Sequence, residues 1–263
     1  MSAIDQLFTR LRQEDRKALI PFLTAGDPDL QVTGRLMHVL QQAGASLCEV
    51  GVPYSDPIAD GPVIQSSYQR VLEKGFRLND VFDLAAEHAP QLEMPLVTMV
   101  SYSICYRVGL EEYVRRAKDA GYHGAIVPDL LVEEADAMSA ICRKHDFSLI
   151  QLVTPTTPRD RQLRIAESSS GFLYFVSVTG ITGERNELPP QLLENVQWLR
   201  EQTPLPICIG FGISSAETAR TLAPVADGII VGSAFVRRIN QFEGEERERE
   251  IGAFAKSLIE AIR

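Results

Sequence analysis

The chain has 263 residues, 45% of them hydrophobic, and 26 Lys and Arg against 35 Asp and Glu give a formal net charge of −9. The apolar content is enough for a globular core, and the acidic balance argues against a nucleic-acid binder because few cations are available to replace phosphate counterions. No apolar run approaches the roughly 20 residues of a membrane-spanning helix, and the charged N-terminus lacks a signal-peptide core.

Short apolar segments recur along the whole chain. They are rich in aliphatic and β-branched residues, with little polar alternation, and lie at 19–24, 47–50, 96–100, 125–127, 148–153, 172–177, 207–209 and 228–231. Such segments are typical of strands in a parallel sheet that is covered on both faces.

Amphipathic helices are predicted between these strands. Apolar residues recur at helical spacing in 32–43, 110–117 and 251–262. Gly44 and Gly121 follow two of these stripes, and glycine accepts the left-handed conformation that ends a helix. The charged stretch 243–250 is interpreted as the solvated start of the last helix.

Eight strand segments, each followed by a helical one, within about 250 residues predict a single-domain (β/α)8 TIM barrel over residues 1–263. No linker rich in Pro, Gly or Ser marks a domain boundary. A doubly wound sheet is the alternative, but no strand is followed at once by a glycine-rich dinucleotide fingerprint.

One acidic side chain stands within the second strand segment. Glu49 is a lone carboxylate there, and Asp60 follows in a loop rich in Gly and Pro, 53–62. Burial in an apolar strand raises a carboxyl pKa, which makes proton transfer possible near neutral pH. A buried Glu paired with Arg or Lys, or one at an exposed strand edge, is the alternative. The acidic loop beside Glu49 favours catalysis, since the loops after the strands carry the chemistry of a barrel.

Glycines follow the last two strand segments, in Gly210-Phe211-Gly212 and in Gly232-Ser233. Glycine lets backbone N–H groups approach an anion closely, and the N-terminus of a following helix adds partial positive charge. Glycines at the ends of two consecutive strand segments indicate a phosphate site, with ordinary turn glycines as the alternative. The polar loop 179–189 after the sixth segment suits a lid, or else an exposed crossover.

Cysteine and histidine patterns indicate neither disulfides nor metal. Cys48, Cys105, Cys142 and Cys208 are widely spaced beside apolar residues and are interpreted as buried thiols in a reducing compartment. The four histidines form no ligand-spaced pair with each other or with a cysteine, so we expect no metal site. These patterns predict a cytoplasmic protein.

Four sequence segments follow one another along the chain: PFLTAGDP at 21–28, EVGVPYSDPIADGPVIQ at 49–65, GITG at 180–183 and GFGIS at 210–214. In this order they resemble the tryptophan synthase alpha subunit family over nearly the whole chain. The resemblance implies a (β/α)8 barrel and a lyase of tryptophan biosynthesis. Its reaction is the retro-aldol cleavage of indole-3-glycerol phosphate to indole and glyceraldehyde 3-phosphate.

The resemblance also implies roles for individual residues. Glu49 matches the general acid/base that protonates indole C3 and helps to deprotonate the glycerol hydroxyl. Asp60 matches the acid that holds the indole N–H and stabilises positive charge on the ring. Tyr174 matches the family's catalytic tyrosine on the sixth strand, with an inward-pointing core tyrosine as the alternative.

Two further groups of residues are implied to contact the substrate. Those expected to enclose the indole ring, which otherwise resemble core residues, are Phe22, Val100, Tyr102, Val127, Val153 and Phe211. Those expected to bind the phosphate are Gly183, Gly212, Gly232 and Ser233, and Thr182 matches a lid residue that closes on Asp60.

The resemblance implies no cofactor in this chain and an α2β2 assembly with a pyridoxal-phosphate beta subunit, which condenses the indole with serine. The family commonly reads Tyr-Asn-Pro after the third strand, in a loop that faces the beta subunit, where this chain has Tyr102-Ser103-Ile104. A stand-alone lyase that releases free indole stays open, and the altered loop slightly favours it. A mainly regulatory subunit also stays open, although the intact acid pair argues against it.

Overall fold

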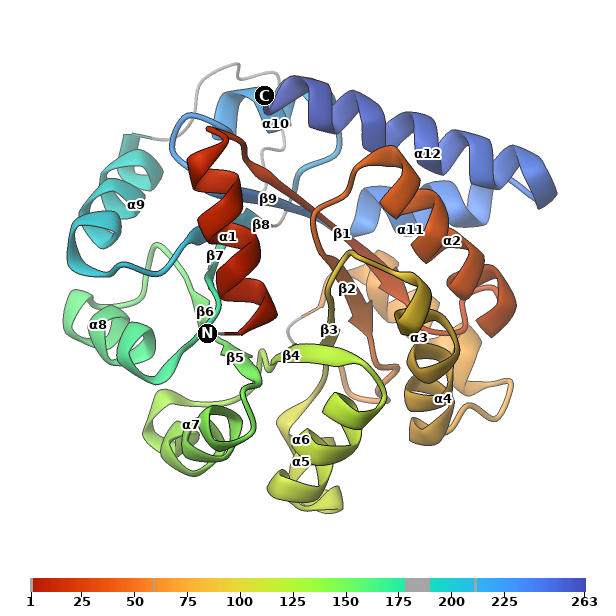
Figure 1. Cartoon of the computed structure of the whole chain (residues 1–263), viewed down its shortest axis with the longest axis horizontal. Coiled ribbons are helices and arrows are strands. Elements are labelled where there is room, and N and C mark those ends of the chain that lie inside the picture. The colour runs from red at the N-terminus through yellow and green to blue at the C-terminus, as the bar shows by residue number, and fades with distance from the viewer. Residues whose placement is uncertain (1, 59, 178–189, 211) are drawn as a thin grey trace.

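The computed structural model describes residues 2–58, 60–177, 190–210 and 212–263 (Figure 1). One sheet lies at its centre, with its strands in the order β5-β4-β3-β2-β1-β9-β8-β7-β6 and every neighbouring pair parallel. The strands are β1 Ala18–Thr24, β2 Cys48–Gly51, β3 Leu96–Met99, β4 Tyr122–Ile126, β5 Ser148–Ile150, β6 Leu152–Val153, β7 Leu173–Val176, β8 Ile207–Gly210 and β9 Gly228–Val231.

The two ends of this order, β5 and β6, are consecutive in the chain and separated only by Gln151. The carbonyls of Leu149 and Gln151 accept the N–H groups of Ser170 and Tyr174, so backbone hydrogen bonding continues toward β7. The sheet is therefore a nearly closed barrel, and the predicted (β/α)8 TIM-barrel fold is confirmed. The prediction of an unbroken strand at 148–153 is wrong, because pairing passes from β4 to β7 at Gln151.

Helices surround the sheet on its outside (Figure 1). Gly44, with φ +98°, ends α2, and Gly121, with φ +101°, follows α6, as predicted. The charged stretch at 243–250 opens the last helix, also as predicted. The outer helices are α2 Leu30–Ala43, α3 Pro62–Leu72, α4 Leu78–His88, α5 Tyr102–Val108, α6 Leu110–Asp119, α7 Ala135–Lys144, α8 Arg159–Ser168, α9 Pro190–Gln202, α10 Ala216–Leu222, α11 Ser233–Gln241 and α12 Gly244–Ala261, with short 3-10 turns η1 Ala89–Gln91 and η2 Val132–Glu134.

The first helix, α1 Ala3–Gln13, was not predicted from the sequence. Its N-terminus carries a capping box, in which Ser2 Oγ accepts the Asp5 N–H at 3.1 Å and Asp5 Oδ2 accepts the Ser2 N–H at 2.9 Å. Its apolar face packs with the inward-facing residues at the starts of the strands, such as Leu47 and Phe172. This helix closes the N-terminal end of the barrel, so the other end is the one available for a site.

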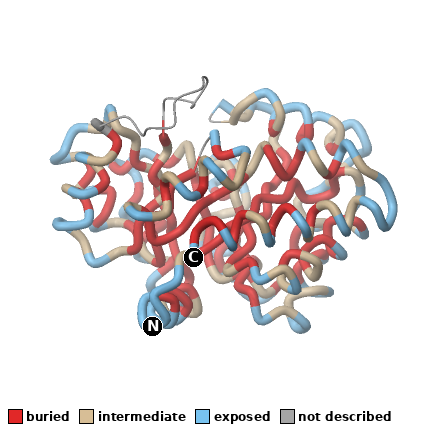
Figure 2. Tube along the Cα trace, turned by 90° about the horizontal axis from the view of Figure 1, so that it is seen from above, coloured by how far each residue is buried: buried red, intermediate tan, exposed pale blue. Residues whose placement is uncertain are grey.

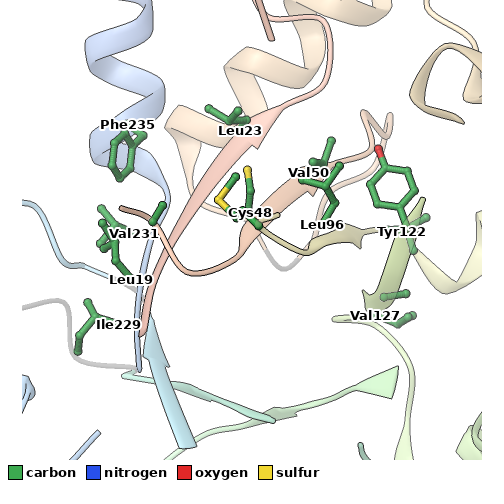
Figure 3. Packing of buried hydrophobic residues seen from close by; sticks show 14 of the residues in the cluster. Leu19, Leu23, Cys48, Val50, Leu96, Tyr122, Val127, Ile229, Val231 and Phe235 are labelled. Carbon is green, nitrogen blue, oxygen red and sulfur yellow. The ribbon is translucent and has the colours of Figure 1, made fainter. Parts of the chain in front are cut away.

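Side chains alternate between the interior and the exterior of the barrel along each strand. In β1, Ile20 faces the interior, whereas Leu19 and Leu23 belong to the cluster between the strands and the helices. Figure 3 shows this outer cluster, which includes Val50 of β2 and Phe235 of α11.

Residues along the central strands are mostly buried, whereas exposed residues lie on the outer helices and loops (Figure 2). All four cysteines are buried and unpaired, as predicted. In the described ranges, no helix is both long and apolar enough to span a membrane.

Candidate active site

A cavity of about 490 Å³ opens at the C-terminal ends of the strands. Its apolar wall includes Phe22, Ile64, Met99, Ile126, Leu152, Val176, Ile213 and Ile230. The polar side chains on the wall are Glu49, Asp60, Tyr174, Ser214, Ser233 and Arg237. An apolar cavity with a few polar groups is the usual form of a small-molecule site, and this end of a barrel is the usual location.

Glu49 lies in β2, opposite Phe22 of β1 and Val97 of β3. Its side chain is 1% exposed, and neither carboxylate oxygen has a hydrogen-bond partner among the described residues. Burial, followed by repulsion from Asp60, raises the pKa of Glu49 to about 8. The buried ion pair that was the alternative for Glu49 does not form within the described part of the chain, and the carboxyl group is protonated at neutral pH.

Asp60 lies in the loop between β2 and α3. The Gln65 side-chain amide donates to the backbone carbonyl of Asp60 at 2.8 Å and to that of Pro57 at 3.3 Å, which ties the loop to the first turn of α3. Burial, followed by repulsion from Asp129, raises the pKa of Asp60 to about 6. At neutral pH, Asp60 is therefore mainly ionised while Glu49 is mainly protonated, which is the division of roles that acid–base catalysis needs.

Tyr174 lies in β7, half-buried, on the same cavity wall. Burial, followed by the charges of Glu49 and Asp60, raises its pKa well above the ordinary value, so its hydroxyl remains a proton donor. A Cβ at Gly210 would lie 2.4 Å from this hydroxyl oxygen, so the glycine leaves the room that Tyr174 occupies.

Tyr68 of α3 is a second tyrosine near the acids, and it was not predicted from the sequence. Its hydroxyl lies 2.8 Å from where a Cβ would stand on Gly51, which is two residues beyond Glu49 in β2. Burial, followed by the charges of Asp60 and Glu49, raises its pKa well above the ordinary value. The helical spacing of Tyr68 with Ile64 and Val71 marks it only as a buried position, so no sequence signal pointed to the site.

The predicted phosphate binders Gly212, Gly232 and Ser233 all line the cavity. Gly212 has φ +78°, a conformation that side chains rarely adopt, and Ser233 is the first residue of α11. The unpaired N–H groups of the first turn of α11 therefore begin at the cavity wall, where an anion is stabilised. Three other predicted site residues, Thr182, Gly183 and Phe211, lie outside the described residues.

Four residues predicted to enclose the ring are placed elsewhere. Val100, Val127 and Val153 belong to the cluster between the strands and the helices, and Figure 3 shows Val127 there. Val100 also borders a pocket of about 30 Å³ beside Asp60. Tyr102 begins α5, and its N–H donates to Asp129 Oδ1 at 2.7 Å.

None of the four lines the described part of the cavity, and their contact with the ring stays a prediction. For the three valines, the physical reason is the alternation of side chains along a strand. Their immediate neighbours Met99, Ile126 and Leu152 have the opposite orientation and line the cavity. Phe22 lines the cavity, and its contact with the ring stays a prediction.

No group of three or more His, Cys, Asp or Glu in the described ranges is arranged to hold a metal ion. The chemistry that the described wall offers is proton transfer by two carboxyl groups of different pKa.

A family model described as "Tryptophan synthase alpha chain" matches residues 8–262. The chain belongs to the tryptophan synthase alpha chain family. A tryptophan synthase alpha chain of Rhodopirellula baltica is 63% identical over 275 residues, covering 100% of this chain and 99% of the relative. One from Arabidopsis thaliana is 41% identical over 261 residues, covering 98% and 95%.

Solved structures of the tryptophan synthase family show the same fold. The tryptophan synthase subunit alpha of Legionella pneumophila is 34% identical with a TM-score of 0.91, covering 100% of this chain and 98% of that one. A chain in the aminoacrylate-bound form of tryptophan synthase from M. tuberculosis is 30% identical with a TM-score of 0.89, covering 100% of both. The predicted family and lyase class are confirmed, and the chain is a lyase of tryptophan biosynthesis.

Proposed function

We propose that the cavity cleaves indole-3-glycerol phosphate to indole and glyceraldehyde 3-phosphate, with Glu49 and Asp60 as its acid–base pair. The observation that carries this proposal is that two carboxyl groups line the same cavity and differ in protonation state at neutral pH. Glu49 is buried without a hydrogen-bond partner among the described residues and has a pKa of about 8, and Asp60 has a pKa of about 6.

Protonated Glu49 starts the reaction by giving its proton to indole C3. The hydroxyl on the carbon attached to C3 then returns a proton to the Glu49 carboxylate, and its oxygen forms the aldehyde C=O. The C–C bond breaks, and its electron pair restores the aromatic ring. Ionised Asp60 accepts the indole N–H and stabilises the positive charge that C3 protonation places on the ring.

The remaining walls of the cavity bind and orient the substrate. Met99, Ile126 and Leu152 provide apolar surface for the indole ring, and Tyr174 offers a hydroxyl donor near Glu49. The phosphate binds at Gly212, Gly232 and Ser233, where α11 begins. Thr182, Gly183 and Phe211 are proposed to complete the site. The reaction requires no cofactor in this chain.

An indole-release assay tests the proposal. The purified chain is expected to release indole and glyceraldehyde 3-phosphate in equal amounts from indole-3-glycerol phosphate. The pH profile of kcat/KM should be bell-shaped, rising near pH 6 as Asp60 ionises and falling near pH 8 as Glu49 loses its proton. A folded chain that released no indole, with or without a beta subunit, would leave only the regulatory alternative.

We further propose that the chain joins a pyridoxal-phosphate beta subunit in an α2β2 assembly in the cytoplasm, where a reducing compartment suits its four unpaired cysteines. The loop after β2 carries Ile58, whose side chain is 86% exposed, and α5 carries Tyr106, which is 71% exposed. Exposed apolar side chains of this kind indicate a docking surface. Indole is small and uncharged, so direct transfer to a partner prevents its loss by diffusion.

Analytical ultracentrifugation of the chain with the beta subunit of its own organism tests this association. We expect a complex at micromolar concentrations, and we expect Asp56→Ala, two residues before Ile58 in the same loop, to weaken activation by the partner more than basal cleavage. The absence of a complex, together with full lyase activity of the chain alone, would instead support the stand-alone enzyme. Ser103 and Ile104 would then be the first positions to examine.

A further inference from the structure

Arg237 is the one cationic side chain on the described wall of the cavity. The other ionisable groups there are Glu49, Asp60 and Tyr174, none of which contributes positive charge. Among the described residues, the other groups that could stabilise a phosphate dianion near Gly232 are backbone N–H groups, the hydroxyls of Ser214 and Ser233, and the partial charge of a helix N-terminus, none of which carries a full positive charge.

The helix geometry places Arg237 on the phosphate side of the cavity. Arg237 follows Ser233, the first residue of α11, by four positions, and residues four apart lie on the same face of a helix. The face that presents Ser233 to the cavity therefore also carries the guanidinium group, one turn farther along.

Among the described residues, Arg237 has no ion pair or ring contact, in contrast to its cationic neighbours. Arg70 of α3 donates to both carboxylate oxygens of Asp27, at 3.1 and 2.7 Å. Arg238 lies over the ring of Phe254, with 3.6 Å from its guanidinium carbon to the ring centre. Arg237 forms no ion pair with any carboxylate in the described ranges, so its charge is available to a ligand.

Arg237 also borders a second hollow, which lies on the outside of the barrel. A groove of about 430 Å³ runs between α3 and α11 and is lined by Arg70, Asn240 and Gln241, among others. Arg237 lines both this groove and the cavity. The guanidinium group therefore stands at the wall that separates the phosphate end of the cavity from the outside.

We propose that Arg237 is a phosphate-binding residue, which makes the site selective for substrates with a phosphorylated tail. This inference rests on the proposed function and adds to it the residue that supplies the countercharge. Charge-assisted hydrogen bonds from arginine to phosphate are among the strongest side-chain contacts, so the residue contributes to affinity as well as selectivity. The contact lies away from the bond that breaks, and it therefore affects KM more than kcat.

Calorimetric titration with two ligands, indole-3-propanol phosphate and unphosphorylated indole-3-propanol, tests the proposal. Arg237→Ala should weaken binding of the phosphorylated ligand by about tenfold or more and leave the unphosphorylated ligand unchanged. Arg237→Lys should retain much of the affinity, and Arg237→Gln, which keeps a polar but shorter and uncharged side chain, should behave as Arg237→Ala does. Arg220→Ala is the matched control, since it removes the same charge from an exposed position near the end of α10 that does not line the cavity.

The outcomes separate this inference from the proposed function. If the wild-type chain prefers the phosphorylated ligand and Arg237→Ala keeps that preference, the role of Arg237 is wrong and the proposed function stands. Equal weakening of both ligands would show a structural effect, and equal weakening by Arg220→Ala would show a general charge effect; either result overturns the proposal. A wild-type chain without any preference for the phosphorylated ligand would overturn both.

Discussion

Glu49→Gln is expected to lower the turnover of indole-3-glycerol phosphate by about 10²–10⁴-fold, the usual contribution of a general acid or base. Glutamine has nearly the same volume and fits the site between Phe22 and Val97, but it has no acidic proton to give to indole C3. Steady-state indole release measures the loss of turnover. Titration with indole-3-propanol phosphate measures binding, which we expect to change little because the phosphate site remains intact.

Two control variants sharpen this experiment. Glu87→Gln makes the same chemical change at an exposed position on α4 and should leave turnover unaltered. Asp60→Asn should also reduce turnover, but less, since a neutral amide oxygen still accepts the indole N–H. If a folded Glu49→Gln protein kept near-normal turnover, proton transfer by Glu49 would be excluded.

Much of this site could be predicted because its chemistry depends on single, unusual residues. A carboxylate within an apolar strand is conspicuous in the sequence, and Glu49 is indeed buried without a partner among the described residues. The glycines at 212 and 232 were equally visible, since strand ends followed by glycine are where a barrel binds phosphate. In these cases the residue type itself carries the information.

The apolar wall of the cavity could not be predicted in the same way. Successive residues of a parallel barrel strand are apolar on both faces, so hydrophobicity does not distinguish Ile126, which lines the cavity, from Val127, which packs under the helices. The orientation is fixed by the register between neighbouring strands, such as Glu49 beside Phe22, and this depends on the whole ring. The strand residues that line the cavity point to the same side of the sheet as Glu49, toward the interior of the barrel.

Arg237 and α1 illustrate two further limits of the sequence. Arg237 is one of 26 basic residues, and only the structure shows that it lacks an ion pair in the described ranges and reaches the cavity. Helix α1 had a detectable signal in the capping box of Ser2 and Asp5. Its role in closing one end of the barrel was not predictable, because that role depends on where the strand ends that it covers lie in space.

The carboxyl group that makes the reaction possible should also destabilise the fold as the pH rises. Glu49 has a pKa of about 8 in the folded chain against an ordinary value of 4.5. Between these two values the folded chain binds a proton that the unfolded chain has released, so the free energy of unfolding falls with rising pH in this window. At pH 7 the loss amounts to at most about 3 kcal/mol, since each pKa unit corresponds to about 1.4 kcal/mol.

Glu49→Gln removes this penalty because the amide never ionises. We expect the variant to exceed the wild-type chain in its free energy of unfolding, by a margin that is small near pH 5 and grows toward pH 8. Urea unfolding at pH 5.5, 6.5 and 7.5 measures the margin, and the exposed Glu87→Gln should show none at any of them. A margin that stayed constant across this range would mean that Glu49 ionises at its ordinary pKa in the folded chain. The assignment of Glu49 as the proton donor at neutral pH would then fail as well, because the stability effect and the catalytic role both arise from the same desolvated carboxyl group.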